Sequence, residues 1–290
     1  GVEMADQWSC HGWNSPKEML NCSELDVVYI ATPIGTHFSL AKQAIEAGKH
    51  VWCEKPLTCS YTDTQTLVSL AEEREKVLTE SFMYLYHPQF YRVKKFVDDS
   101  KLIHSVVCRF GIPALDKPGF RNNSKLCGGA LWDVGCYAIY ATRYVLNAEP
   151  IRVHGVAYDS GNWGVDTTFC GLMQFEGGAI ANITGSMEEL FLCHISINGS
   201  NGRIEIPNMF DDSGPIIITT VDRQDCKTEQ TITVPAPDRF MAQLDEFSCC
   251  ILTEKHPEFP ADDGLKNTAI LEALYESARL GRAVDVKLPE

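Results

Sequence analysis

Two kinds of hydrophobic pattern alternate along the first third of the chain. Apolar runs occupy residues 27–31 and 50–53, and apolar residues between them recur at helical spacing. Short apolar runs bounded by turn residues are typical of buried strands, and recurrence every three to four positions is typical of a helix. Residues 26–56 therefore predict a strand, a helix that ends near Gly48 and a second strand, which together make one βαβ unit.

The alternation continues as far as residue 84. Polar residues at 61–64 are a helix start signal, a helical pattern follows them, and residues 77–83 then predict a third parallel strand. The order strand, helix, strand, helix, strand is that of half a doubly wound nucleotide-binding sheet. We therefore expect residues 1–84 to form a Rossmann-like domain, with the domain boundary near Leu85.

Beyond this boundary, strand-like segments outnumber helices. Helical spacing is found at 88–98, 128–146, 240–252 and 262–280, and strand-like segments lie at 103–112, 151–158, 167–175, 179–187, 193–198, 203–206, 215–221 and 228–234. Strands that follow one another without intervening helices predict an antiparallel sheet backed by helices. Residues 85–290 are therefore expected to form a second domain of α+β type, and the chain as a whole is of the α/β class.

Charge and cysteine content narrow the possible functions. The 25 Lys and Arg residues against 39 Asp and Glu give a net charge of −14, without a basic run. This argues against nucleic acid or an anionic membrane as partner, and no stretch approaches the ~20 apolar residues of a membrane span. The twelve cysteines show no CxxC pair and no zinc spacing. We interpret them as reduced, mostly buried thiols of a cytoplasmic protein without a metal site.

The ends of the first two strands carry residues suited to chemistry. Thr32-Pro33 follows the first strand and Glu54-Lys55-Pro56 follows the second. Parallel strands end at the same edge of a sheet, and open α/β sheets bind ligands there. Lys55 therefore points into a predicted crevice, because the following proline restricts its backbone. A solvated loop lysine paired with Glu54 is an alternative of about equal weight.

A second group of candidates lies in the stretch GGALWDVGCY. In a helix, Asp133 and Tyr137 are four residues apart and share one face, where they are suited to bind hydroxyls and transfer a proton. The alternative is a packing tyrosine whose hydroxyl finds a backbone partner. Two of the weaker candidates are His37, which either contacts a cofactor or packs in its helix, and Arg121, which either binds a substrate oxygen or lies at the surface.

Several stretches, in order, resemble the Gfo/Idh/MocA oxidoreductase family, which includes glucose–fructose oxidoreductase and inositol dehydrogenase. They are DVVYIATPIGTHFSLAKQAIEAGKHVWCEKPL, YLYHPQFYRVKKFV, FRNNSKLCGGALWDVGCYAIYATRYVL and NTAILEALYESARLGRAVDV. The stretch GGALWDVGCYAI, which has tyrosine at 137, most resembles the corresponding stretch of glucose–fructose oxidoreductase, dimeric dihydrodiol dehydrogenase and the NADP-dependent xylose dehydrogenases.

The resemblance implies a fold, a reaction and an assembly. It implies an N-terminal Rossmann domain for NAD or NADP, with NADP slightly favoured, followed by a domain with a large, mostly antiparallel open sheet. That sheet commonly joins subunits, so we expect a homodimer or homotetramer. The implied reaction is hydride transfer between nicotinamide C4 and a carbinol or carbonyl carbon of a sugar, polyol or diol. Substrate choice would then depend on loops of the second domain, such as 112–125 and 159–166.

The resemblance also assigns roles to residues. It makes Lys55 and Tyr137 the catalytic pair, with Asp133 binding substrate, and Arg121 is added as a substrate-binding candidate. The cofactor-binding residues it implies lie along the nicotinamide half: Ala31, Thr32, Pro33, His37, Glu54, Lys55 and Pro56. Tyr137 is expected to transfer the proton, and the neighbouring Lys55 ammonium is expected to lower its pKa from the usual value of about 10.

One expected motif is missing from this sequence. Relatives carry a G-x-G-x-x-G turn before the point that corresponds to Gly1, and no such turn occurs here. The first domain is therefore expected to be an N-terminally incomplete Rossmann domain, either because the sequence is incomplete, the favoured interpretation, or because the protein is naturally short. In the second case the alternative function is a non-catalytic sugar-binding or scaffold protein.

Overall fold

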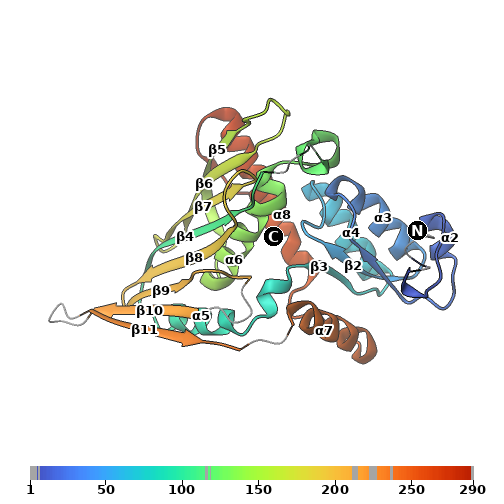
Figure 1. Cartoon of the computed structure of the whole chain (residues 1–290), viewed down its shortest axis with the longest axis horizontal. Helices are drawn as coiled ribbons and strands as arrows, with labels where there is room; N and C mark the ends of the chain where they lie inside the picture. The colour runs from blue at the N-terminus through green and yellow to red at the C-terminus, as the bar shows by residue number, and fades with distance from the viewer. Residues whose placement is uncertain are drawn as a thin grey trace.

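The computed structural model describes residues 5, 7–114, 117, 119–210, 215–221, 227–235 and 238–288. Its N-terminal part contains a three-stranded parallel sheet in the order β1 (Val27–Ile30), β2 (His50–Glu54) and β3 (Leu78–Ser81). The crossover helices α3 (His37–Glu46) and α4 (Tyr61–Glu73) connect these strands (Figure 1). A short helix, α2 (Pro16–Leu20), precedes the sheet and is capped by Ser15. The predicted βαβαβ order is confirmed.

The local signals in this part act as the sequence predicts. Ser60 accepts a hydrogen bond from the backbone N–H of Asp63 and so caps α4. Gly48 has a φ of +77°, a conformation that ends α3 without a steric penalty. The buried residues of α3 are His37, Ala41, Ala44 and Ile45, which face the sheet. Hydrophobic packing of this helix therefore fixes where the strand ends lie.

The second sheet has nine strands in the order β11-β10-β9-β8-β4-β7-β6-β5-β12 (Figure 1). Neighbours pair antiparallel, except that β4 and β7 are parallel. The strands are β4 (Ile103–Gly111), β5 (Pro150–Tyr158), β6 (Thr168–Phe175), β7 (Ile180–Ser186), β8 (Leu192–Gly199), β9 (Gly202–Ile206), β10 (Pro215–Val221), β11 (Lys227–Thr233) and β12 (Val284–Asp285). The large, mostly antiparallel open sheet is confirmed, and the two-residue strand β12 is the one that the hydrophobic pattern did not predict.

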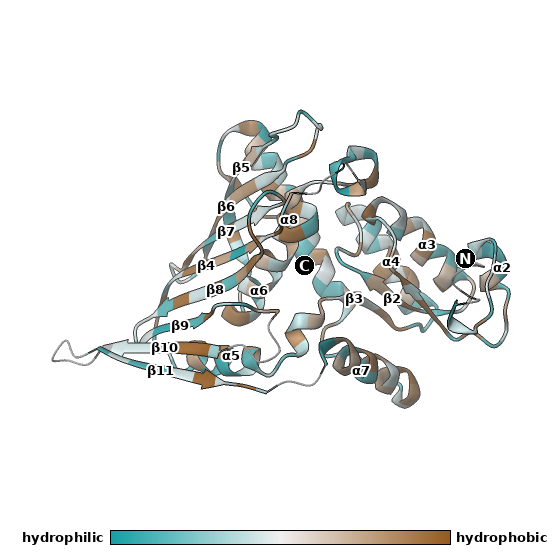
Figure 2. Ribbon diagram, in the orientation of Figure 1, coloured by the Kyte–Doolittle hydropathy of each residue, from teal (hydrophilic) through white to brown (hydrophobic). Residues whose placement is uncertain are grey.

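Within the described ranges, helices pack on one face of this sheet. α5 (Gln89–Asp98), α6 (Cys136–Leu146) and α8 (Ala261–Leu280) pack on the face turned towards the first sheet (Figure 1). The opposite face exposes apolar side chains at alternate positions, among them Val156, Tyr158, Leu172 and Ile180. The hydropathy of the strands is accordingly mixed along their length (Figure 2).

The C-terminal helices connect the two sheets. α8 packs on α6 and β5 of the large sheet and also on α4 of the small one. The Tyr61 N–H donates to the Glu272 carboxylate across this contact, at 2.8 Å. α7 (Arg239–Thr253) lies beside the small sheet, where Phe247 packs near Trp52. The carboxyl edge of β2 therefore faces the start of α6. No helix in the described part of the chain is long and apolar enough to cross a bilayer.

One disulfide corrects the interpretation of the cysteines as reduced thiols. Cys59, in the loop after β2, is bonded to Cys127, just before α6, over a sequence separation of 68. The other cysteines in the described ranges are free, and five of them are buried. The sequence concealed this pair because its members belong to different domains and come together only when the sheets face each other.

Candidate active site

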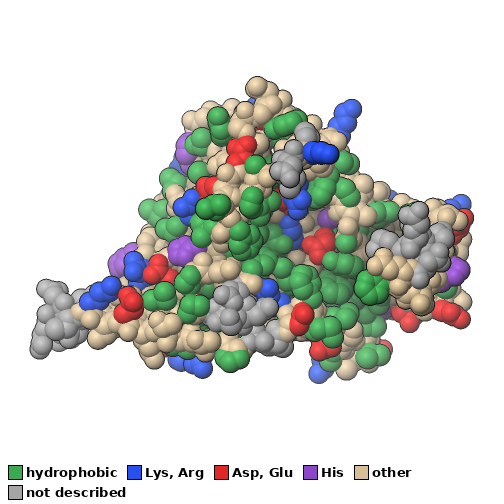
Figure 3. All heavy atoms as spheres, viewed as in Figure 1, with side chains coloured by type: hydrophobic (Ala, Val, Ile, Leu, Met, Phe, Trp, Pro, Cys, Tyr) green, Lys and Arg blue, Asp and Glu red, His purple; other side chains and the backbone are tan. Residues whose placement is uncertain are grey.

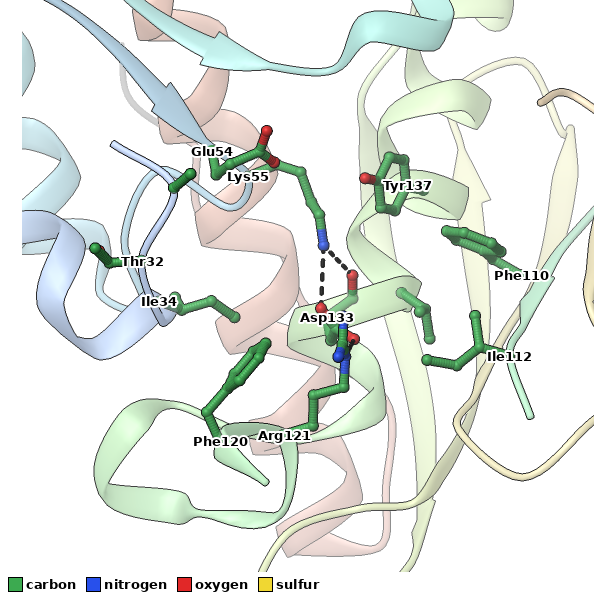
Figure 4. A pocket seen from close by; sticks show the side chains of 12 residues that line it. Thr32, Ile34, Glu54, Lys55, Phe110, Ile112, Phe120, Arg121, Asp133 and Tyr137 are labelled. Carbon is green, nitrogen blue, oxygen red and sulfur yellow. Dashed lines mark hydrogen bonds and ion pairs between the residues drawn. The ribbon is translucent and has the colours of Figure 1, made fainter. Parts of the chain in front are cut away.

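A pocket of about 300 Å³ lies between the carboxyl edge of the small sheet and the start of α6. Strand ends of the small sheet form one wall, and the loop that carries Phe120 and Arg121 forms another (Figure 4). Its lining residues are Ala31, Thr32, Ile34, Glu54, Lys55, Phe110, Ile112, Phe120, Arg121, Asp133, Val134 and Tyr137. The crevice predicted from the strand ends is therefore present.

Lys55 crosses the pocket to reach the second domain. Its ammonium Nζ lies 2.5 Å from the backbone carbonyl of Asp133 and 3.1 Å from Oδ1 of that residue. The side chain is only 11% exposed. Glu54 is not its partner, because the Glu54 carboxylate accepts a 2.6 Å hydrogen bond from the Tyr29 hydroxyl. The alternative of a solvated lysine paired with Glu54 is therefore wrong.

Asp133 is a buried carboxylate held by two cations. Besides Lys55, Arg121 contacts it, with 2.5 Å between Nε and Oδ2. Burial alone would raise the pKa of Asp133, but the two positive charges together lower it below the usual value. The same ion pair raises the pKa of Lys55, despite the opposing effect of burial. Lysine, aspartate and arginine therefore form one charged cluster at the pocket floor (Figure 4).

The helix that carries Asp133 begins differently from the prediction. Gly128 and Gly129 precede it, and residues Leu131–Gly135 form a π-helical turn before α6 begins at Cys136. Gly129 has a φ of +126°, outside the helical region, so a helix cannot start there. The carboxylate of Asp166 instead accepts from the N–H of Leu131 at 2.8 Å. π-helical turns are rare, and those that occur are often found at functional sites.

Tyr137 lies on the same pocket wall as Asp133, as predicted, in an aromatic surrounding. Phe82, Phe110 and Phe210 pack around its ring with centroid separations of 5.4, 4.9 and 5.4 Å. The Lys55 Nζ lies 4.7 Å from the ring centroid. Burial raises the pKa of Tyr137, and the nearby ammonium only partly opposes this. The expectation of a lowered pKa is therefore wrong, because the aromatic shell excludes water.

The remaining cofactor candidates divide into two groups. Ala31, Thr32 and Glu54 line the pocket, whereas Pro33, His37 and Pro56 do not. His37 is 1% exposed, and its ring nitrogens lie 2.8 Å from the Thr32 carbonyl and 3.0 Å from the Pro56 carbonyl. Burial lowers its pKa. His37 therefore bridges the turn after β1 and the turn after β2. This agrees with the alternative that His37 packs in the fold.

Sequence reasoning missed the apolar part of the pocket. Ile34, Phe110, Ile112, Phe120 and Val134 all line it. The signal for Phe110 was its position at the end of a strand, and Phe120 carries the Arg121 guanidinium over its ring at 4.7 Å. Of the two loops expected to choose substrate, 112–125 contributes to this pocket, although residues 115, 116 and 118 lie outside the described residues. The loop 159–166 instead lines a separate cavity of about 420 Å³ beside the disulfide.

The surface around the pocket is largely apolar. Figure 3 shows hydrophobic side chains gathered in the middle of the face between the two sheets, with a few charged side chains among them. Charged groups surrounded by apolar walls act in a lower dielectric than water, which strengthens their interactions. The site therefore combines an apolar wall with a small number of charged groups, which is typical of a small-molecule pocket.

Comparison with known proteins agrees with this arrangement. Residues 2–82 match the model of an oxidoreductase family with an NAD-binding Rossmann fold, and residues 90–205 match the GFO/IDH/MocA C-terminal domain. D-xylose 1-dehydrogenase (NADP(+)) 2 of Haloferax volcanii is 30% identical over 278 residues, which cover 94% of this chain and 84% of that protein. The chain belongs to this oxidoreductase family.

Other members show how far the likeness extends. The dTDP-3,4-didehydro-2,6-dideoxy-alpha-D-glucose 3-reductase of Actinomadura kijaniata is 30% identical over 266 residues, which cover 90% of this chain and 79% of that protein. The structure of aldose-aldose oxidoreductase from Caulobacter crescentus, complexed with glycerol, has a TM-score of 0.88 and 26% identity, covering 98% and 88% of the two chains. Membership makes this chain an NAD- or NADP-dependent oxidoreductase acting on CH–OH groups, which confirms the family resemblance.

Proposed function

We propose that Lys55, Asp133 and Tyr137 carry the reaction of this oxidoreductase and that its substrate is a sugar, polyol, diol or sugar nucleotide. One observation supports this most directly. The Lys55 ammonium lies between the Asp133 carboxylate and the Tyr137 ring, in a pocket at the carboxyl edge of the parallel sheet. Two relatives, each 30% identical to this chain, are named as a D-xylose dehydrogenase and a dTDP-sugar reductase, which supports the substrate class.

The residues present fit the nicotinamide end of a dinucleotide. Ala31, Thr32 and Glu54 line the pocket at the ends of β1 and β2, where open α/β sheets bind nucleotides, and Ile34 adds an apolar surface for a ring. In this proposal they hold the nicotinamide riboside, while Pro33, His37 and Pro56 shape the two turns behind them. NAD or NADP, when bound, supplies or accepts a hydride at nicotinamide C4.

Tyr137 is assigned the proton transfer. Reduction of a carbonyl places negative charge on its oxygen, and a phenol beside it supplies the proton that this oxygen needs. The raised pKa of Tyr137 keeps it protonated and ready to donate. In Figure 4 its hydroxyl points to the side of the pocket on which Lys55 lies. The Lys55 ammonium favours both the developing alkoxide and the phenolate that remains. In the reverse direction Tyr137 first loses its proton to solvent, and the phenolate beside Lys55 then accepts the carbinol proton.

Asp133 and Arg121 are assigned to substrate hydroxyls. Both line the pocket, and they present an acceptor and several donors to its interior. In this proposal, the hydroxyl groups of a polyhydroxylated substrate form hydrogen bonds to the pocket-facing atoms of Asp133 and Arg121. This arrangement favours substrates with adjacent hydroxyls over a simple alcohol.

The test compares two tyrosines that differ only in position. Tyr137→Phe is expected to lower kcat by roughly 10²- to 10⁴-fold, the usual contribution of a positioned acid or base. Tyr158→Phe, on the exposed face of the sheet, serves as the control. Substrates are screened as aldoses, polyols and diols with NADPH and NADH, following nicotinamide fluorescence. Near-normal turnover by Tyr137→Phe would refute the assignment, and no fluorescence change with either cofactor would favour the non-catalytic alternative.

Three further proposals concern the whole protein. We propose that the domains are residues 1–84 and 85–290, that the protein is cytoplasmic, and that subunits associate through the outer face of the large sheet as a dimer or tetramer. The nine free cysteines of the described ranges favour the cytoplasm, and the Cys59–Cys127 disulfide is the exception. The exposed side chains of Val156, Tyr158, Leu172 and Ile180 on the outer face support the third proposal. Light scattering of wild-type protein and Tyr158→Lys tests it, because a charge in such an interface is expected to release monomers.

A further inference from the structure

A buried glutamate with no part in the reaction described above lies behind Lys55. Glu80 is on β3, the strand next to β2, which ends directly before Lys55, and is 7% exposed. Its Oε1 accepts a 2.8 Å hydrogen bond from the backbone N–H of Leu57. Within the described residues, its Oε2 is buried without a hydrogen-bond partner. Burying a carboxylate with one oxygen unpaired costs free energy. We therefore expect Glu80 to have a function other than stabilising the fold.

The hydrogen bond that the Glu80 carboxylate accepts comes from the chain directly after Lys55-Pro56. Lys55 is followed by Pro56, which has no N–H, so the Leu57 N–H is the first backbone donor beyond the catalytic lysine. Glu80 binds this donor from the adjacent strand. The direction in which the chain leaves Lys55 is therefore fixed by a side chain of the sheet core.

The other side of the carboxylate is closed by α8. A Cβ on Gly264 would lie 2.7 Å from Oε2, so the glycine allows α8 to approach the carboxylate closely. The Glu80 carbonyl is also within 3.4 Å of the Gln243 side chain of α7. Glu80 is therefore confined between the strand that carries it, the Lys55 turn and the C-terminal helices.

Charged groups reach Glu80 from several elements. Asp263 of α8 opposes its ionisation, whereas Arg143 of α6 and Lys55 of the β2 turn favour it. The neighbouring thiol of Cys53 on β2 is buried. Burial is the largest influence and raises the pKa of Glu80 to about 7, although the Leu57 N–H bond and the two cations oppose this.

We propose that Glu80 is a positioning residue for Lys55: by binding the Leu57 N–H it holds the turn that directs the Lys55 ammonium to Asp133 and Tyr137. The inference rests on the proposed function, because it acts through Lys55. It differs from a purely structural role in a measurable way. A stabilising carboxylate affects the folded fraction, whereas a positioning residue changes kcat of the fully folded enzyme.

The test uses two substitutions of one side chain. Glu80→Gln keeps an oxygen acceptor for the Leu57 N–H, and Glu80→Leu removes it. Glu80→Leu is expected to lower kcat by roughly 100-fold, the size of effect that a small misplacement of a catalytic group produces. The KM for the nicotinamide cofactor should change less than roughly threefold. Glu80→Gln should restore most of kcat, because its amide oxygen still accepts the hydrogen bond from the Leu57 N–H.

Controls separate positioning from stability. Thr79→Val changes a buried neighbour on the same strand and should leave kcat unchanged in the folded protein. Gly264→Ala keeps Glu80 but places a methyl group against Oε2, and is expected to lower kcat although alanine favours the helix. This variant gives the answer if Glu80→Leu does not fold.

The outcomes are distinct for the two proposals. Full kcat in folded Glu80→Leu, or in Gly264→Ala if Glu80→Leu does not fold, would overturn the positioning role while a loss in Tyr137→Phe still upholds the proposed function. Normal turnover in Tyr137→Phe would overturn the proposed function itself. Equal losses in Glu80→Gln and Glu80→Leu would show that the acceptor for Leu57 is not what matters, and would also overturn the positioning role.

Discussion

The Lys55 ammonium and the Arg121 guanidinium bind the same carboxylate, that of Asp133, at 3.1 Å and 2.5 Å. Lys55 comes from the end of a strand in the first domain, and Arg121 comes from a loop of the second. Asp133 therefore joins the two sides of the pocket. Its removal would leave a buried lysine ammonium with no carboxylate, and with the backbone carbonyl of residue 133 and the Tyr137 ring as its remaining described contacts.

Asp133→Asn is expected to destabilise the protein by about 3 kcal/mol, the lower end of the cost of breaking a buried ion pair. The lower end applies because Arg121 is 31% exposed and retains access to water. Urea unfolding gives the free energy directly. The matched control is Asp99→Asn, which breaks the exposed Lys95–Asp99 pair and should cost less than about 1 kcal/mol. Equal stability of the two variants would contradict the structural role of Asp133.

The same substitution should change how stability depends on pH. Because the folded pKa of Asp133 is lowered, its contribution is present above the unfolded value of about 4 and is lost as pH falls towards the folded pKa. Asp166 acts in the opposite sense, because burial raises its folded pKa. The informative quantity is therefore the difference in unfolding free energy between wild type and Asp133→Asn. That difference should shrink below about pH 4, and a constant difference from pH 3 to 7 would contradict the assignment.

Gly129 is predicted to be the glycine on which the site geometry depends. It has a φ of +126°, and a Cβ there would lie 2.5 Å from Asp166 Oδ1 and 2.9 Å from the Tyr275 hydroxyl. Gly178 also has a positive φ, of +94°, but has open space around it. Gly178→Ala therefore measures the backbone cost alone, about 1 kcal/mol. Gly129→Ala is expected to cost at least about 2 kcal/mol more, because it displaces the carboxylate that caps the Asp133 turn.

Thermal unfolding and turnover of both glycine variants provide the measurement. Gly129→Ala should lose activity as well as stability, since the Leu131 N–H bond to Asp166 fixes where the π turn begins. Gly178→Ala lies in a hairpin turn and should retain kcat. If the two variants lose the same stability, the close approach at Gly129 has no energetic consequence.

Much of this architecture is predictable because hydrophobic periodicity and strand-end geometry are local and general. The runs before Thr32 and Glu54 predict two parallel strands, and their common carboxyl edge brings Thr32 and Lys55 to one crevice. The grouping of Lys55 with Asp133 and Tyr137 follows only from the family resemblance. The local pattern does not show how deeply each ionisable group is buried, although burial controls its pKa. Tyr137 beside a lysine was expected to have a lowered pKa, yet burial among aromatic rings raises it.

The features that were missed depend on contacts between distant segments. The π turn at Asp133 arises because Asp166, more than thirty residues later, binds the N–H of Leu131. Glu80 resembles an ordinary strand residue until β3, the Lys55 turn and α8 enclose it. Cys59 and Cys127 resemble unrelated thiols until the two sheets face each other.

The Cys59–Cys127 disulfide is expected to stabilise the protein and to hold the Arg121 loop over the pocket. It closes a loop with a sequence separation of 68, and the chain-entropy model gives about 4 kcal/mol for such a loop. Dithiothreitol or Cys127→Ser should therefore lower the unfolding free energy by up to this amount. Because Cys59 follows Lys55 by four residues and Cys127 follows Arg121 by six, reduction should raise the substrate KM more than it lowers kcat.

The controls use the other thiols of the chain. Cys10→Ser removes an exposed free cysteine and should respond to dithiothreitol as wild type does. Cys127→Ser should show no further response, since its bond is already absent. Alkylation of the unfolded protein followed by intact mass counts free thiols and should find two more after reduction. An unchanged count, or an unfolding midpoint that dithiothreitol does not move, would contradict a disulfide that connects the two walls of the active site.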